Sequence, residues 1–183
     1  MEILTIFANR LYSFKYKKRG KDEYARIFDE WNDSEFLFDF FEEHKKDLLS
    51  GFYSTITVEE AVMRTIDEAN ALVDKLLDCG IQKNKSALDL FFKNDLHSRS
   101  PFKELIPKKG YGNKTKSWLR LYAIQISKEC YIITGGAIKL TKAMQDRPHT
   151  KKELSKVNKC LDFLRVEGIF DLKGVLETIE IES

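Results

Sequence analysis

Residues 118–140 constrain the fold most, because their pattern is typical of two adjacent antiparallel strands. In the first part, small and aliphatic residues alternate with a second set that includes Arg120 and Tyr122, so the two sets lie on opposite faces of a strand. A polar turn follows, and the chain then returns with the composition of a partner strand. The pair Gly135-Gly136 is expected to break or bulge that second strand.

Two capping boxes predict where long helices begin. In the pattern Thr-x-x-Glu, the threonine hydroxyl accepts from the backbone N–H of the glutamate, and the glutamate side chain accepts from the threonine N–H. Thr57–Glu60 is followed by apolar residues at helical spacing up to Gly80, a natural helix end. Thr150–Glu153 opens a second stripe of this kind, which ends at Gly168.

Shorter patterns complete the prediction of an α+β fold in which an antiparallel sheet with an N-terminal strand carries several helices on one side. No linker divides the chain, so we expect residues 1–183 to form a single domain. Residues 1–99 hold the strand and a helical portion, and residues 100–183 hold a basic antiparallel sheet and a C-terminal helix. The shorter elements are a strand region at 2–16, helices at 22–31, 34–49 (capped by Ser34) and 86–93, loops at 94–101 and 108–116, a strand that ends near Pro107, and a small strand in the tail 169–183.

Composition excludes several classes of protein. Hydrophobic residues make up 43% and charged residues 33% of the chain, with only 9 Gly and 3 Pro, which rules out collagen-like and low-complexity disordered proteins. No run of about 18 apolar residues is present, so we expect no contact with a membrane. The three cysteines, Cys79, Cys130 and Cys160, form neither a disulfide scaffold nor a zinc motif, and a reduced cytoplasmic location is the simplest interpretation.

The net charge of +2 conceals a strongly basic segment. Residues 103–159 hold 14 Lys and Arg against 4 Asp and Glu. Such an excess favours a polyanionic partner such as nucleic acid and a salt-sensitive association; the alternative is a solvated lysine-rich surface. The candidate RNA-binding residues are Lys108, Lys109, Lys114, Lys116, Lys142 and Arg147.

Few conventional catalytic groups are present. The three histidines are scattered, no Cys/His cluster predicts a metal site, and no glycine-rich phosphate loop predicts a nucleotide cofactor. Arg120 and Lys139 instead stand in otherwise apolar strands. Each either faces solvent or belongs to a concave basic sheet that holds a phosphate.

Several aromatic residues allow two interpretations each. Trp118 and Tyr131 either stack on bases or belong to the core or the sheet surface. The Phe-rich stretch 36–41 is expected to be core, or a lid packed on the core. His149 is either a proton carrier or simply a residue before a helix cap.

Residues 118–124 and 130–141 resemble the RelE/HigB-like bacterial toxins. In those proteins a strand with an arginine near its start leads through a hairpin to a strand that ends in an apolar-x-Lys-Lys-Thr type of motif. A proline and a helix with an acidic residue follow, comparable here to Pro148–Glu153. The resemblance covers about residues 100–165, and it departs from the family at Leu140, where the family has its second basic residue.

The resemblance implies a RelE-like core with an enlarged helical N-terminal half, and ribosome-associated mRNA cleavage that needs neither metal nor cofactor. By motif, Arg120 matches the strand arginine and Lys139 the basic residue, and both stabilise the charge that forms when the 2′-hydroxyl of the substrate attacks the adjacent phosphate. Tyr122, Tyr111 or a lysine of lowered pKa then carries protons. The implied partners are RNA or the ribosome, and a cognate antitoxin.

Two further hypotheses stay open. The same fold could serve as a non-catalytic binding protein for nucleic acid or a protein target, of phage or mobile-element origin, and both Leu140 and the large helical addition favour this alternative. Alternatively, the helical half makes a protein interface, for which the stretch 36–41 is the candidate.

Overall fold

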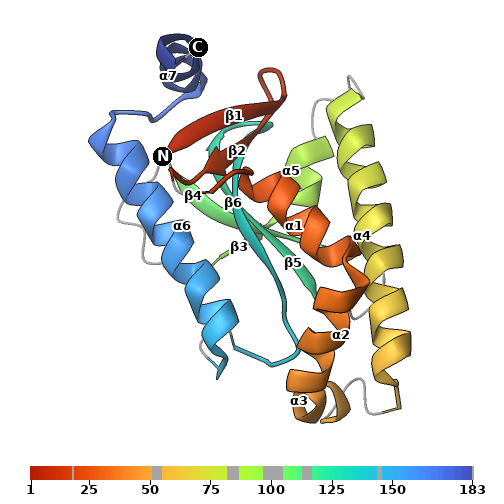
Figure 1. The fold of residues 1–183 in the computed structure, drawn as a ribbon. Coiled ribbons are helices and arrows are strands. Elements are labelled where there is room, and N and C mark those ends of the chain that lie inside the picture. The colour runs from red at the N-terminus through yellow and green to blue at the C-terminus, as the bar shows by residue number, and fades with distance from the viewer. Residues whose placement is uncertain are drawn as a thin grey trace.

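A six-stranded sheet runs through both halves of the chain (Figure 1). The computed structural model describes residues 1–17, 19–50, 55–81, 87–96, 105–112, 117–143 and 146–182. Within these ranges the strand order is β1-β2-β6-β5-β4-β3, and neighbouring strands are antiparallel except β2 and β6, which are parallel. The strands are β1 (Glu2–Phe7), β2 (Leu11–Lys15), β3 (Asn94–Asp95), β4 (Ile106–Tyr111), β5 (Leu119–Ser127) and β6 (Cys130–Ile138).

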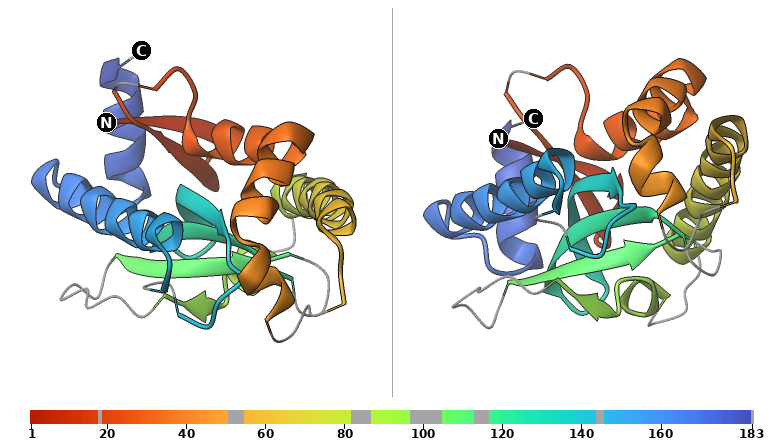
Figure 2. Two further views of the ribbon diagram at one scale, coloured as in Figure 1. Left: turned by 60° about the horizontal axis from the view of Figure 1, so that its bottom comes forward. Right: turned by 90° about the horizontal axis from the view of Figure 1, so that it is seen from below.

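Helices cover both faces of this sheet, whereas the sequence predicted them on one side. We call face A the face that carries Leu119 and Leu121, and face B the face that carries Arg120 and Tyr122. Helices α1, α2, α4 and α5 pack on face A, and α6 and α7 pack on face B (Figure 2). Because β5 and β6 are apolar on both faces, each face needs a cover. The helices are α1 (Glu23–Asn32), α2 (Ser34–Glu43), α3 (Lys45–Leu49), α4 (Val58–Ile81), α5 (Ala87–Phe91), α6 (Pro148–Val166) and α7 (Leu172–Glu182).

None of the helices in the described ranges is long and apolar enough to cross a membrane.

The predicted hairpin is confirmed as the pair β5 and β6. The two strands are antiparallel, and Arg120 lies opposite Ala137. The register shifts between Tyr122, which pairs with Gly135, and Ala123, which pairs with Ile133, so the bulge lies at Thr134, directly before the glycine pair where it was expected. The alternation of the two faces along β5 is also as predicted.

The predicted N-terminal strand region forms two strands. The chain turns between them at Asn9, which takes a positive φ of 63°, and β2 then returns antiparallel to β1. Only Leu11–Ser13 pair with Tyr131–Ile133 of β6. Among the described residues, β6 therefore has no strand neighbour on this side beyond Ile133, and helices must cover that edge.

The two predicted capping boxes have different outcomes. The first forms: Glu60 N donates to Thr57 Oγ1 at 3.2 Å, and Thr57 N donates to Glu60 Oε2 at 2.8 Å. The second does not form, because α6 begins earlier, at Pro148, a residue favoured at the first helical position. Glu153 points instead to the sheet, where it accepts from a backbone N–H of β6.

The predicted helix at 34–49 also differs in its cap and its length. Asp33, not Ser34, accepts from the first N–H groups of α2. The helix is interrupted at His44, and α3 continues after it. An aspartate one residue earlier offers a stronger acceptor than serine, because its side chain is charged at the positive end of the helix.

Several predictions for this part of the chain are wrong. The expected loop at 94–101 contains strand β3, and the strand expected to end near Pro107 instead begins at Ile106 as β4, which takes up part of the expected basic loop. Pro107 is tolerated in β4 because the N–H that it lacks would face the short edge strand β3, on the side where its carbonyl accepts from Leu96 N at 2.9 Å. The tail forms helix α7 rather than a strand. Gly168, with φ +68°, ends α6 as expected.

Candidate functional site

Three of the predicted cationic residues come together at one end of face B. Arg120 lies opposite Tyr111 of β4 and Ala137 of β6. Lys109 lies two residues before Tyr111, and Lys139 two residues after Ala137, so both share the face of Arg120. We call Lys109, Arg120 and Lys139 the basic cluster.

The guanidinium of Arg120 is held at the end of the strand. Its Nη1 donates to the carbonyl of Ser117 at 2.7 Å and to that of Leu119 at 2.8 Å. Its Cζ lies 4.2 Å from the centre of the Tyr111 ring. These contacts fix the plane of the guanidinium while the side chain stays half-buried.

Lys139 is also half-buried, and its ammonium faces other cations. Its Nζ donates to the backbone carbonyls of Thr141 at 2.9 Å and of Lys142. Burial, and then the charges of Arg120 and Lys109, lower the pKa of Lys139 below the value of an ordinary lysine. Arg120 and Lys109 are therefore close enough to Lys139 to repel its charge.

The two lysines of the basic cluster differ from Lys108 in that they form no ion pair with a described carboxylate. In the described part of the chain, neither Lys109 nor Lys139 has a carboxylate within 4.0 Å. Lys108, in contrast, lies on face A and its Nζ is 2.6 Å from a carboxylate oxygen of Asp95. A cation without a carboxylate partner keeps its charge available for an anion.

The remaining predicted RNA-binding residues, Arg147 and three lysines, do not belong to the basic cluster. Arg147 forms an ion pair with Asp47, and this guanidinium lowers the pKa of that carboxyl. Lys142 is exposed in the turn after Lys139, to which it offers its backbone carbonyl. Lys114 and Lys116 lie outside the described residues.

Tyr122 lies beneath the basic cluster. Its side chain is 1% exposed, and its hydroxyl has no hydrogen-bond partner among the described residues. Burial, opposed by Arg120 but reinforced by Glu153 and Tyr111, raises the pKa of Tyr122 above its ordinary value. A buried phenol with a raised pKa is a poor base at neutral pH.

The other aromatic residues considered as base-stacking platforms are in the core. Trp118 and Tyr131 are both buried on face A, and Trp118 Nε1 donates to Thr65 Oγ1 at 3.0 Å. In the stretch 36–41, Leu37 and Phe41 are buried, while the other side chains are more exposed.

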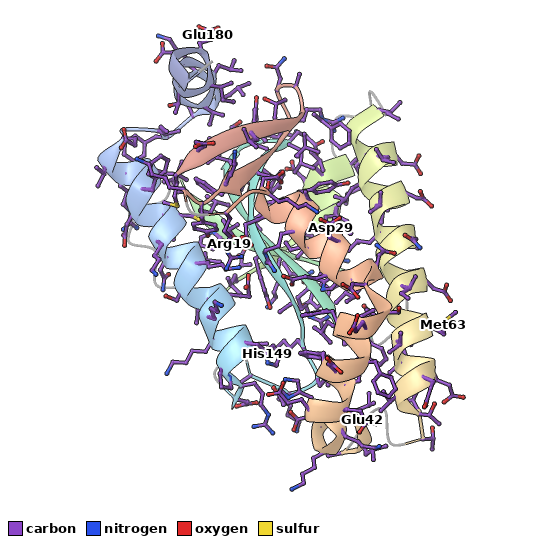
Figure 3. The ribbon with its side chains drawn as sticks, in the orientation of Figure 1. Arg19, Asp29, Glu42, Met63, His149 and Glu180 are labelled. Carbon is purple, nitrogen blue, oxygen red and sulfur yellow. The ribbon has the colours of Figure 1, made fainter. Side chains whose placement is uncertain are left out.

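A cleft of about 370 Å³ lies beside the basic cluster, between α1, α2, α6 and the outer edge of β6. Ala137 connects the two, since it lines the cleft and is the β6 partner of Arg120. Figure 3 shows two of its residues, Arg19 near the start of α1 and His149 at the start of α6. The α1 and α2 wall carries Trp31, Phe36, Phe40 and His44, and the α6 wall carries His149, Lys152, Glu153 and Lys156.

Aromatic rings fill one end of this cleft. The rings of His44 and His149 are 4.8 Å apart, and that of Phe40 lies 4.5 Å from the first and 5.2 Å from the second. The Nε2 of His149 is 3.0 Å from the carbonyl of Ile138. Burial lowers the pKa of His149 below the ordinary value of a histidine, which favours the neutral ring. Of the two interpretations of His149, the position before a helix cap is wrong, because the residue lies within the first turn of α6.

Side chains take the place of a strand along the cleft edge of β6. The carbonyl of Thr134 is 3.4 Å from the Tyr16 hydroxyl, and Gly136 N donates to Glu153 Oε2 at 3.1 Å. With His149 at Ile138, three consecutive outward positions of β6 have a side-chain partner.

Buried charges connect that edge to α1. Lys156 Nζ lies 2.7 Å from Glu153 and 2.9 Å from Glu23, which is fully buried. Arg26 Nη2 lies 2.7 Å from Glu23, and its Nη1 lies 2.6 Å from Glu30. Burial raises the pKa of Glu153 although Lys156 opposes it. We call Glu23, Arg26, Glu153 and Lys156 the buried ion network.

The glycine pair is needed for this arrangement. A Cβ at Gly135 would lie 2.0 Å from Glu153 Oε2, so Gly135→Ala must move the carboxylate from its contacts. We expect this change to lower the free energy of unfolding by roughly 1–3 kcal/mol, measured by urea denaturation. Gly20→Ala is the control, because a Cβ there has no atom within 4 Å. Equal stability losses in both variants would contradict the steric argument.

Among the described residues, no group of three His, Cys, Asp or Glu side chains is placed to hold a metal ion. Comparison of the chain with protein-family models, curated proteins and solved structures finds no match. The interpretation of the site therefore depends on its own geometry.

Proposed function

We propose that this protein is a RelE-like endoribonuclease that cleaves mRNA on the ribosome. The observation that carries the proposal is the basic cluster: Lys109, Arg120 and Lys139 share one end of face B, and neither lysine has a carboxylate partner in the described part of the chain. Like charges repel, so a cluster of this kind favours an anion such as an RNA phosphate. The proposal includes a cytoplasmic location and a cognate antitoxin.

The chemistry needs only the substrate and these side chains. The 2′-oxygen bonds to the adjacent phosphorus and the bond to the 5′-oxygen breaks, which leaves a 2′,3′-cyclic phosphate and a 5′-hydroxyl. Arg120 offers a planar fork to the phosphate oxygens as negative charge builds up. The proton of the 2′-hydroxyl passes to water, and Lys139, as an ammonium of lowered pKa, protonates the departing 5′-oxygen. This role falls to Lys139 rather than to Tyr122, which is buried.

The departure from the toxin motif at Leu140 does not remove a cation from face B. Leu140 packs against the core on face A, opposite Lys139. A lysine at this position in the same backbone would point away from the basic cluster. Leu140 is therefore weaker evidence against catalysis than the sequence motif alone suggests.

A non-catalytic RNA-binding protein on this fold is the second candidate. It is favoured by the hydrogen bonds that both Arg120 and Lys139 already donate to backbone carbonyls, because these must loosen or be shared when a phosphate binds.

Induced expression in bacteria separates the two candidates. Wild-type protein is expected to arrest growth and produce new mRNA 5′ ends, mapped by primer extension, and the Arg120→Ala/Lys139→Ala variant is expected to do neither. Normal growth and intact mRNA with soluble wild-type protein would favour the binding protein. Growth arrest with intact mRNA would contradict the nuclease proposal.

A further inference from the structure

We propose that the cleft between α1, α2 and α6 binds one ribonucleotide. The base would lie against the aromatic α2 wall, and the phosphate would lie between Arg19, which precedes α1, and Lys152 of α6. This site is distinct from the basic cluster and does not require that the protein cleaves RNA.

The size and lining of the cleft fit such a ligand. Its volume of about 370 Å³ is at the lower end of small-molecule sites, which suits a single nucleotide. Phe36 and Phe40 present rings that are nearly parallel, with an interplanar angle of 24°. Aromatic rings of this kind accept a nucleobase by stacking, whatever the base.

The charges of the cleft leave two cations for a phosphate. Four cationic side chains and three carboxylates line it. Arg26 and Lys156 are held in the buried ion network, which takes up the carboxylates of Glu30 and Glu153 as well and leaves Glu43 as the third. Lys152 is exposed and has no carboxylate within 4.0 Å in the described part of the chain. Among the described residues, Arg19 makes one long ion pair of 3.4 Å, with Glu23, and its Cζ lies 6.0 Å from the centre of the Tyr16 ring.

Continuity with the basic cluster argues for RNA as the source of the nucleotide. Ala137 lines the cleft, Arg120 lies opposite it across the β5–β6 pair, and Lys139 follows two residues later. A phosphodiester chain bound at the basic cluster would therefore pass the mouth of the cleft, where a flanking base can enter. A free mononucleotide shares this chemistry, and the experiment distinguishes the two sources.

Isothermal titration calorimetry of the purified protein tests the site. The probes are AMP, GMP, CMP and UMP, ribose 5-phosphate as a probe without a base, and a short 2′-O-methyl RNA whose 2′-oxygen cannot attack. We expect Phe36→Ala and Lys152→Gln each to weaken nucleotide binding roughly tenfold, because stacking and a phosphate contact are lost. Phe36→Ala is not expected to change the binding of ribose 5-phosphate.

The chain supplies matched controls on the same helices. Phe38 is 43% exposed against 39% for Phe36, and it does not line the cleft; Lys151 is an exposed neighbour of Lys152 that also does not line it. Phe38→Ala and Lys151→Gln are expected to change binding less than twofold.

Each outcome decides the proposal. Phe36-dependent binding of mononucleotides supports a site that takes free nucleotides, and Phe36-dependent binding of the RNA alone supports a subsite for a flanking nucleotide. No binding of any probe, or equal losses in the test and control variants, would overturn the proposal. The Arg120→Ala/Lys139→Ala variant should retain Phe36-dependent mononucleotide binding, so a failure of the nuclease hypothesis is seen separately.

Discussion

Lys139→Ala is expected to lower the rate constant for RNA cleavage by purified protein at least about 100-fold, the size of effect usual for a general acid. The change removes the proton donor for the 5′-oxygen and one of three charges that face the transition state. Arg120→Ala is expected to have an effect of similar size. The double variant should lose less than the product of the two, because both residues act on one phosphate. Cleavage of a labelled RNA under single-turnover conditions, with or without ribosomes, measures these rates.

The pH profile tests the role of Lys139 more specifically. The pKa of Lys139 is lowered by burial and by Arg120 and Lys109, so its proton is lost at a lower pH than that of an ordinary lysine. Activity that needs the ammonium is present below this pKa and falls as the pH rises through it. Lys139→Arg keeps the charge but does not give up its proton in this range, so the variant should lose the general-acid part of the rate, and its residual activity should show no alkaline fall.

A lysine outside the proposed site supplies the control. Lys159 is exposed on α6 and does not line the cleft, and Lys159→Ala removes the same formal charge. We expect its cleavage rate to stay within about twofold of wild type. If folded Lys139→Ala and Lys159→Ala proteins cleave equally fast, the assignment of Lys139 is wrong.

The hairpin could be predicted from sequence because its signals are local and mutually consistent. The alternation along β5 gives the face of each residue, so the sequence alone assigns Arg120 and Tyr122 to one face. The same two-residue period places Lys139 beside them. The pattern could not show which of these cations form ion pairs within the protein, as Lys108 does with Asp95.

The cleft and its network could not be predicted, because they depend on contacts between distant segments. Thr150–Glu153 satisfies the local capping rule, yet Glu153 reaches Gly136 in the sheet and Lys156 reaches Glu23 on α1. The edge that Glu153 covers exists only because β2 leaves β6 after Ile133. A four-residue motif does not contain information about such distant contacts. A Glu and a Lys on the buried side of one helix nevertheless indicate that each has a charged partner in another segment.

Glu23→Ala is expected to lower the free energy of unfolding by about 3–5 kcal/mol, because it leaves buried cations without their carboxylate. Glu23 is fully buried and accepts from Arg26 Nη2 at 2.7 Å and from Lys156 Nζ at 2.9 Å. Its loss leaves Lys156, itself only 8% exposed, with Glu153 as its remaining partner. Urea denaturation followed by circular dichroism measures the change as a shift of the midpoint at constant slope.

Further variants show whether Glu23→Ala lowers stability because it leaves buried cations unpaired or because it shortens a packed side chain. Glu30→Ala removes another carboxylate bonded to Arg26, but Glu30 is 38% exposed, so a loss below about 1 kcal/mol is expected. Lys156 also neutralises the buried carboxylate of Glu153, so Lys156→Met and Glu153→Gln are added together to Glu23→Ala. These two changes remove both the stranded cation and its remaining partner and should restore part of the stability. If they lower stability further, the penalty comes from lost packing at α1 and not from an unpaired charge. The buried ion network would then be a consequence of how α1 and α6 pack, and not what holds them against the edge of β6.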